Sequence, residues 1–349
     1  MNNYDKVKNE LRRKPKIWLI TGVAGFIGSN LLEALLNLNQ KVVGIDNFST
    51  GHVRNLEEVK ENVGIDKYAG FELLEGDIGN FDTCRKALNK VEIVLHQAAM
   101  GSVPRSIEDP LKANEINVTG FVNMIISSKE AGAKRFVFAS SSSVYGDLQG
   151  LPQREEKIGQ ALSPYAITKY INELYADIFA RTYDLEYIGL RYFNIFGPRQ
   201  DPDGDYAAVI PKWFSEIISQ KDVYINGDGK TSRDFCYIDN CVQCNLLAAL
   251  TKSKNALNRI YNVSFGQETT LEELFFMIRA CVSQKYPEVE MIKPKYRDFR
   301  PGDVRRSLAD ITRARDLLGY NPEFSVQDGL EKAADWYINL CLSLESSNP

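Results

Sequence analysis

Short apolar runs alternate with longer segments of helical periodicity through the first 195 residues of the chain. The runs are mostly Val, Ile, Leu and Phe, which is typical of parallel strands covered by helices on both faces. They predict six strands, at residues 17–21, 42–46, 71–75, 93–96, 136–140 and 187–191. Apolar spacing predicts helices at residues 26–38, 109–131 and 165–183. The pattern indicates an α/β fold with a Rossmann-type doubly wound parallel sheet.

The alternation stops near residue 196. Gly197 and Pro198 are followed by the run 201–205, which is rich in Asp and Gly and typical of a loop. We therefore expect two domains, residues 1–195 and residues 196–349. The second should be a smaller α/β unit, interleaved with the first near the edge of the sheet.

Composition narrows the class of partner. The net charge of −4 and the pI near 5.5 give no basic footprint for nucleic acid, so a small-molecule ligand is favoured. The sequence has no run of about 18 apolar residues and no apolar signal segment at its start, so we expect a cytoplasmic protein without a membrane partner.

The six cysteines are scattered, which indicates reduced thiols. Cys241 and Cys244 have the spacing of half a zinc site, but no second pair follows and the surrounding residues predict a helix. His52 and His96 are far apart in sequence, so we predict no metal site.

A glycine-rich turn joins the first strand to the first helix. Gly22, Gly25 and Gly28 follow the strand at 17–21 in the spacing Gly-x-x-Gly-x-x-Gly. Glycines at such a turn let the backbone approach a pyrophosphate, which the N–H groups of the helix start then bind. Asp46 ends the next strand, eighteen residues beyond Gly28, where an acid binds the ribose hydroxyls and repels a 2′-phosphate. NAD is therefore favoured over NADP.

Further residues follow the third and fourth strands. Asp77 and Ile78 come after the third strand, and Gln97, Ala98 and Ala99 after the fourth. Turns and caps would explain each alone. Because these residues follow the glycine turn in this order, at the ends of successive strands, they together predict one cofactor site.

Candidate catalytic residues lie further along. A serine run, residues 140–143, ends the fifth strand, and Tyr165 and Lys169 follow four residues apart. That spacing places both side chains on one helix face. A phenol with a pKa near 10 is a poor base, but a nearby ammonium and the nicotinamide charge favour phenolate. An ordinary helix pair is the alternative, which the preceding cofactor motifs disfavour.

On these residues the chain resembles the extended short-chain dehydrogenase/reductase family. It is most similar to the nucleotide-sugar 4-epimerases, in the branch acting on UDP-N-acetylglucosamine and its uronic acid. The resemblance spans essentially the whole length. The matching motifs are residues 21–28, 46–51, 101–106, 140–143, 165–169, 191–194, 226–229 and 233–235.

The resemblance implies a role for each domain. Residues 1–195 would bind NAD and residues 196–349 the UDP-sugar, in a homodimer joined through paired helices. The implied catalytic residues are Ser141, Ser142, Tyr165 and Lys169. The implied cofactor residues are Gly22, Gly25, Phe26, Ile27, Gly28, Asp46, Asn47, Phe48, Ser49, Gly51, Asp77, Ile78, Gln97, Ala98, Ala99, Tyr165 and Lys169.

The implied reaction is inversion at carbon 4 of a UDP-N-acetylhexosamine, for the synthesis of polysaccharide precursors. Tyr165 would take the proton of the 4-hydroxyl while the hydride passes to NAD, giving a 4-keto sugar. The sugar would then turn over, and the hydride would return to its other face. NAD would stay bound, because no net oxidation occurs.

The substrate residues are likewise implied by the resemblance. They are Gly101, Ser102, Ser141, Ser142, Ser143, Tyr165, Asn194, Val209, Trp213, Tyr224, Asn226, Arg233, Arg300, Asp303 and Ser307. Arg233 and Arg300 would clamp the diphosphate and Asp303 the uridine ribose, although arginines are often simply solvated. Ser307, four residues beyond Asp303, would leave room for the N-acetyl group, where a large aromatic side chain would exclude it.

Other functions remain open. A 4-epimerase of UDP-N-acetylglucosaminuronic acid would need a cation for the carboxylate, which the sequence alone does not assign. Dehydratases and decarboxylases of the superfamily need acidic residues where this chain has Ser142 and Ser143. A redox-inactive NAD-binding regulator would have no need to retain both Tyr165 and Lys169.

Overall fold

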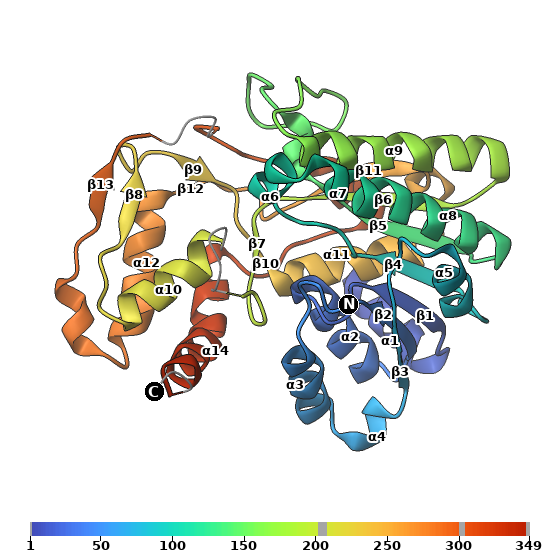
Figure 1. Ribbon diagram of the computed structural model, residues 1–349, viewed down its shortest axis with the longest axis horizontal. Coiled ribbons are helices and arrows are strands. Elements are labelled where there is room, and N and C mark those ends of the chain that lie inside the picture. Colours follow the sequence, from blue (N-terminus) through green and yellow to red (C-terminus); the bar gives the residue numbers. More distant parts are fainter. Residues whose placement is uncertain (1, 202–207, 300–303, 347–349) are drawn as a thin grey trace.

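The main sheet has seven parallel strands in the order β11-β6-β5-β4-β1-β2-β3 (Figure 1). The computed structural model describes residues 2–201, 208–299 and 304–346. The strands are β1 Ile17–Thr21, β2 Lys41–Asp46, β3 Phe71–Glu75, β4 Ile93–His96, β5 Arg135–Ser141, β6 Tyr187–Tyr192 and β11 Arg259–Val263. The six predicted strands are confirmed to within one residue at each end, and the doubly wound fold is confirmed with them. The seventh strand, β11, was not predicted.

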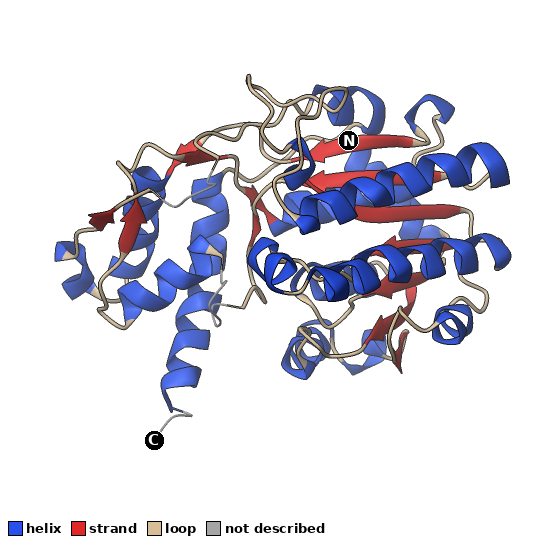
Figure 2. Cartoon of the chain, turned by 45° about the horizontal axis from the view of Figure 1, so that its top comes forward, coloured by secondary structure: helices blue, strands red, loops and turns tan. Residues whose placement is uncertain are grey.

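Both faces of the sheet are covered by helices, as Figure 2 shows. Within β1, Trp18 and Ile20 face one hydrophobic core and Leu19 faces the other, and all three are fully buried. This explains why the central strands are continuously apolar instead of alternating. The edge strand β3 differs, since Glu72, Leu73 and Glu75 are exposed.

One core lies beneath α5, α8 and α9, and the other beneath α2, α3 and α11. These helices are α2 Phe26–Asn37, α3 Val53–Val63, α5 Phe81–Ala87, α8 Gly120–Glu130, α9 Pro164–Tyr183 and α11 Ile238–Leu250. The predicted helices at 26–38 and 165–183 are confirmed. Cys241 and Cys244 lie buried in α11, which confirms the helix predicted around them.

The predicted helix at 109–131 is helical throughout but not uniform. It consists of α7 Pro110–Asn114, the π-helix Glu115–Thr119 and α8. A π-helix holds an extra residue per turn and is often found at functional sites. The change in winding places Asn117 beside the loop that follows β4.

A smaller unit lies at the left of Figure 1. Its helices are α10 Val209–Ile218, α12 Leu271–Ser283 and α14 Val326–Ser346. Its short strand pairs are β8 Tyr224–Asn226 with β13 Lys295–Arg297, and β9 Ser232–Arg233 with β12 Thr269–Thr270. The strands β7 Ile195–Phe196 and β10 Cys236–Tyr237 pair between the two units. Although α11 and β11 follow residue 196, they pack on or pair within the main sheet.

The remaining elements are short or peripheral. They are α1 Asn3–Arg13, α4 Ile65–Tyr68, α6 Val103–Glu108, α13 Thr312–Leu318 and the 3₁₀-helices Ser142–Tyr145, Lys254–Ala256 and Pro287–Met291. The segment before β1 is therefore structured: Val7 and Leu11 of α1 are buried, and α1 packs against α11. Within the described ranges, no helix has the length and apolarity needed to cross a bilayer.

Candidate active site

The glycine turn after β1 is a tight backbone crossing. Gly22 has φ +69°, and a Cβ atom there would lie 3.0 Å from the backbone of Ala98. A Cβ atom at Gly28 would lie 2.0 Å from the carbonyl oxygen of Gly22. Gly25 precedes α2 and has no side chain to cap it, so the N–H groups of the helix start are open to an anion. This cradle fits a dinucleotide pyrophosphate, with Phe26 and Ile27 in its first helical turn.

Asp46 lies at the end of β2 beside this turn. Its carboxylate accepts hydrogen bonds from the N–H groups of Ala24 and Phe48, each at 2.8 Å. A Cβ atom at Gly51 would lie 2.9 Å from Asp46 Oδ1, so only glycine allows residues 48–51 to fold this closely over the carboxylate. Each carboxylate oxygen keeps a lone pair for a ribose hydroxyl. The placement fits the predicted role.

The strand ends bring further predicted cofactor residues together. Asn47 donates through Nδ2 to Asp77 at 2.8 Å and accepts from the N–H of Ser49. The Ile78 carbonyl accepts from Asn123. These contacts link the carboxyl ends of β2 and β3 to α8, at the edge of the sheet where ligands bind in doubly wound folds.

Thr21 fixes the loop that follows β4. Its hydroxyl accepts from the N–H groups of Gln97 and Ala98 at 3.1 and 3.0 Å, and lies 2.9 Å from His96 Nδ1. With both lone pairs occupied, the hydroxyl proton points to His96. Burial, with Lys169 nearby, lowers the pKa of His96 to about 3, so the imidazole is neutral and can accept it. Tyr192 donates to the Gln97 side chain at 3.0 Å.

Ser141, Tyr165 and Lys169 converge at the end of β5. Ser141 is the last residue of that strand, and its hydroxyl acts on the Tyr165 phenol, whose pKa it lowers. Tyr165 lies in the first turn of α9, whose start is capped by the Ser163 side chain. The Lys169 ammonium donates to the Ala139 carbonyl at 2.9 Å and lies 5.9 Å from the centre of the Tyr165 ring.

Burial controls the ionisation of this group. It raises the pKa of Tyr165, partly offset by the hydrogen bond with Ser141, and it lowers the pKa of Lys169 to about 8. The chain alone therefore does not favour the phenolate predicted from the sequence. The bias toward phenolate would have to come from the Lys169 ammonium together with the positive charge that arrives with the cofactor.

The other serines of the run have separate positions. Ser142 and Ser143 begin the 3₁₀-helix after β5 and are half-buried, and the N–H of Ser143 donates to Ser141 Oγ at 3.1 Å. Ser140 donates to Glu173 on α9 at 2.5 Å.

A buried ion pair beneath the site was not predicted. Arg191 donates to both carboxylate oxygens of Glu173, at 2.9 and 2.7 Å, and lies over the Tyr145 ring. Glu173 is one turn beyond Lys169 on α9, so the pair fixes the catalytic helix against β5 and β6. The sequence signal was a carboxylate on the same helix face as Lys169.

Asn117 is a second residue that the sequence did not reveal. It lies in the π-helix, accepts from the N–H of Met100 at 2.7 Å and donates to Thr168 of α9 at 3.1 Å. It thus ties the loop that carries Gly101 and Ser102 to the catalytic helix. No local pattern marks the change in winding that puts it there.

The predicted substrate residues are spread over the smaller unit. Asn194 donates to the Asp234 carbonyl at 3.1 Å, and Arg233 lies in β9. Tyr224 and Asn226 lie in β8, where Arg297 contacts both.

Three predicted substrate residues are shielded to different degrees. Trp213 is buried against Phe275, Val209 begins α10, and Ser307 is 9 % exposed. Arg300 and Asp303 lie outside the described residues, so their predicted roles stay predictions.

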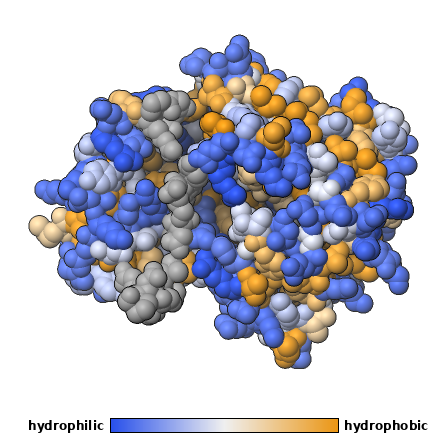
Figure 3. Space-filling view, viewed as in Figure 1, coloured by the Kyte–Doolittle hydropathy of each residue, from blue (hydrophilic) through white to orange (hydrophobic). Residues whose placement is uncertain are grey.

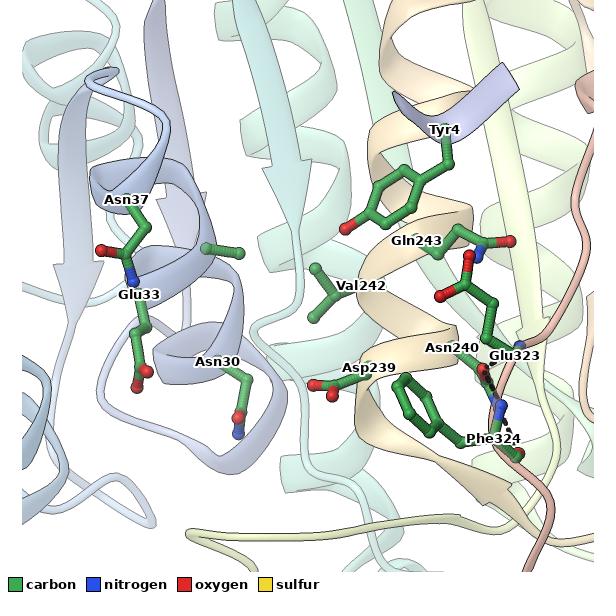
Figure 4. A pocket seen from close by; sticks show the side chains of 11 residues that line it. Tyr4, Asn30, Glu33, Asn37, Asp239, Asn240, Val242, Gln243, Glu323 and Phe324 are labelled. Carbon is green, nitrogen blue, oxygen red and sulfur yellow. Dashed lines mark hydrogen bonds between the residues drawn. The ribbon is translucent and has the colours of Figure 1, made fainter. Parts of the chain in front are cut away.

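A separate pocket of about 240 Å³ lies between α1, α2 and α11 (Figure 4). None of the predicted site residues lines it. Its lining is Tyr4, Asn30, Glu33, Ala34, Asn37, Asp239, Asn240, Val242, Gln243, Glu323 and Phe324.

Residues 18–264 match the NAD dependent epimerase/dehydratase family. The chain belongs to this family. NAD is therefore the cofactor, and the glycine turn and Asp46 fit it. Membership confirms the broad resemblance seen in the sequence.

Relatives of known activity cover nearly the whole chain. A UDP-N-acetylglucosamine 4-epimerase structure from Methanobrevibacter ruminantium, in complex with UDP-N-acetylmuramic acid, is 36% identical with a TM-score of 0.85, over 94% of this chain and 99% of that one. A UDP-glucose 4-epimerase from Mycolicibacterium smegmatis is 35% identical over 92% of this chain and 98% of its own length. A UDP-glucuronic acid 4-epimerase structure from Bacillus cereus, with UDP-glucuronic acid and NAD, is 30% identical with a TM-score of 0.81, over 93% and 99% of the two chains.

Proposed function

We propose that this family member is a UDP-sugar 4-epimerase and that its preferred substrates are UDP-N-acetylglucosamine and UDP-N-acetylgalactosamine. The observation that carries the proposal is the convergence of Ser141, Tyr165 and Lys169 at the carboxyl end of β5, beside an NAD-binding glycine turn. Relatives of this chain are named as 4-epimerases of UDP-glucose, UDP-glucuronic acid and UDP-N-acetylglucosamine.

The chain's own residues supply the proton transfer. Tyr165 takes the proton of the 4-hydroxyl, and the Ser141 hydroxyl, which lowers the pKa of the phenol, holds the sugar oxygen in line. Lys169, one turn along and held by the Ala139 carbonyl, stabilises the phenolate as a cation. Bound NAD supplies the chemistry at carbon 4, by accepting a hydride and returning it.

The preference for an N-acetylated sugar rests on Ser307. A serine is small, and it lies in the segment that runs beside β9, where the backbone of Arg305 accepts from Ser232. A large side chain at this position would fill space that the acetamido group needs. The Methanobrevibacter relative, named for UDP-N-acetylglucosamine, supports the same choice.

A uronic-acid substrate is the second candidate, because the Bacillus cereus relative binds UDP-glucuronic acid. It would require a cation beside the sugar carboxylate. A cytoplasmic location and a role in polysaccharide precursor synthesis stay predictions.

A homodimer is also proposed. Apolar side chains on α9 recur along one stripe and remain exposed, namely Ile167, Leu174 and Ile178, with Leu111 on α7 nearby in the fold. Apolar atoms gather over the upper right of Figure 3, where these helices lie in Figure 1. Exposed apolar patches of this kind mark protein interfaces.

A panel of UDP-sugars, resolved by NMR after incubation with the protein, tests the proposal. The account expects interconversion of UDP-N-acetylglucosamine and UDP-N-acetylgalactosamine faster than that of UDP-glucose and UDP-galactose. Turnover of uronic acids alone would favour the second candidate. A redox-inactive regulator would convert none of them and would show no transient absorbance of reduced cofactor.

A further inference from the structure

Asp234 is a fully buried carboxylate that the proposed chemistry does not use. It lies between β9 and β10, next to Arg233. Its Oδ1 accepts from the N–H of Gly266 and its Oδ2 from the N–H of Ala309, both at 3.1 Å. Two separate segments of the chain are thus held by one side chain.

The backbone of the same residue holds a third segment. The Asp234 carbonyl accepts from Asn194 Nδ2 at 3.1 Å and from the Ser264 hydroxyl at 3.4 Å. Asn194 follows β6, Ser264 and Gly266 follow β11, and Ala309 lies 75 residues further along the chain than Asp234. The residue therefore joins segments that are distant in sequence.

These segments carry proposed substrate residues. Asn194 is itself one of them, Arg233 is the neighbour of Asp234, and Ser307 is two residues before Ala309. We propose that Asp234 is a positioning residue of the substrate site, whose ionised carboxylate fixes the Ser307 segment against the strand that carries Arg233. This inference rests on the proposed function, because it takes these residues to bind the UDP-sugar.

The chemistry of the carboxylate makes the role testable. Burial raises the pKa of Asp234 to about 6, and hydrogen bonds to its carboxyl from the Ser264 hydroxyl and from the N–H groups of Ala309, Gly266 and Gln267 offset this only in part. An ionised carboxylate only accepts hydrogen bonds, whereas the protonated form must donate one. Below about pH 6, one of the backbone N–H donors should therefore lose part of its acceptor, and the two segments that carry Gly266 and Ala309 should loosen.

One neighbouring carboxylate also has a raised pKa: burial raises that of Glu155, which accepts from the N–H of Asn262 in β11 at 2.9 Å. Arg306 lowers the pKa of Glu268, and hydrogen bonds to Thr312 lower the pKa of Asp310. Burial raises the pKa of the Cys236 thiol well above its usual range, so it stays neutral. Because the terminal phosphate of UDP also gains a proton at about pH 6, Asp234 is reported by the difference in pH dependence between the native chain and a variant that lacks this carboxylate.

Acid should have opposite effects on UDP binding and on folding: protonation of Asp234 should weaken UDP binding but increase the free energy of unfolding. Because the pKa of Asp234 is raised in the folded state, the folded chain binds this proton more tightly than the unfolded chain. Its contribution to stability therefore increases as the pH falls from about 6 toward 4. A purely structural carboxylate would alter the unfolding midpoint and leave UDP affinity unchanged.

The experiment measures the Kd of UDP by calorimetry on the NAD-loaded protein, from pH 7 to pH 5. The native chain should bind more weakly as the pH falls. Asp234→Asn places an amide that can accept at only one of its two atoms, and should weaken UDP binding about tenfold at pH 7, equivalent to ~1.4 kcal/mol. Its Kd should then depend on pH less steeply than that of the native chain, keeping only the part that comes from protonation of the UDP terminal phosphate. At saturating UDP-sugar, Asp234→Asn should lower kcat by a smaller factor than it raises the Kd of UDP, because Tyr165 and Lys169 lie on other elements.

Two further variants make the result interpretable. Ser264→Ala removes a hydroxyl that lowers the pKa of Asp234, so the pH dependence of the Kd should move to higher pH even if Asp234→Asn fails to fold. Asp310→Asn removes a partly exposed carboxylate next to Ala309 and should leave the profile unchanged. If Asp234→Asn binds UDP as tightly as the native chain, or if Ser264→Ala leaves the pH dependence of the Kd unmoved, the inference about Asp234 is overturned and the proposed function is not. No UDP binding by the native chain would instead overturn the proposed function.

Discussion

The ammonium of Lys169 lies 5.9 Å from the centre of the Tyr165 ring, one helical turn away, and is held in place by the Ala139 carbonyl. This buried cation is the chain's own contribution to stabilising a phenolate. Since burial lowers the pKa of Lys169 to about 8, the charge is present at neutral pH and is lost in mild alkali.

Activity should therefore fall as the pH rises through about 8. A profile of kcat from pH 6 to 10 checks this, and Lys169→Met should have low activity without that fall. Stability should move the other way: because the folded-state pKa is below 10.5, the cost of burying the ammonium is relieved as the pH rises from about 8 toward 10.5. A native kcat that stays flat to pH 10 would separate Lys169 from the reaction.

Replacing Tyr165 with Phe should reduce kcat by roughly 10² to 10⁴, the usual contribution of a positioned proton-transfer group. The ring keeps its packing at the start of α9, so the fold and the NAD content should be retained. Turnover assays, with cofactor released by denaturation as the control, measure both. Near-native turnover would remove Tyr165 from the mechanism.

Much of this site was predictable because its signals are local. The glycine turn, Asp46 and the Tyr165–Lys169 spacing each lie within a few residues, and they follow strands whose apolar character marks them clearly. Strand β11 escaped prediction because Arg259 and Asn262 interrupt its apolar pattern, and it pairs with β6 from far along the chain. The contacts of Glu173, Asn117 and Asp234 also depend on tertiary packing, which no short motif encodes.

The Glu173–Arg191 pair should matter strongly for stability. Glu173→Ala leaves a buried guanidinium without its partner, which costs about 3–5 kcal/mol of unfolding free energy. Asp177→Ala is the matched control, because it breaks an exposed pair with Arg181 on the same helix and should cost about 0.5 kcal/mol or less. Urea unfolding compares them. If the two variants lower the unfolding free energy equally, burial of the Glu173–Arg191 pair adds nothing to its stabilising effect.

Ser307→Tyr should change the choice of substrate. The added ring would occupy the space proposed for the acetamido group, so kcat/KM should fall for UDP-N-acetylglucosamine and hold or rise for UDP-glucose. The ratio of the two values is the measurement. An equal loss on both substrates would show that Ser307 does not discriminate between them, and no loss on either would place it away from the sugar.

The central claim is that the hydrogen on carbon 4 leaves and returns as a hydride within one active site. UDP-N-acetylglucosamine carrying deuterium at carbon 4, incubated with the purified protein and no added reductant, tests it by NMR of the product. The account predicts UDP-N-acetylgalactosamine that retains deuterium at carbon 4, because the hydride does not exchange with water. Product that has lost the label to solvent, or no product at all, would contradict it.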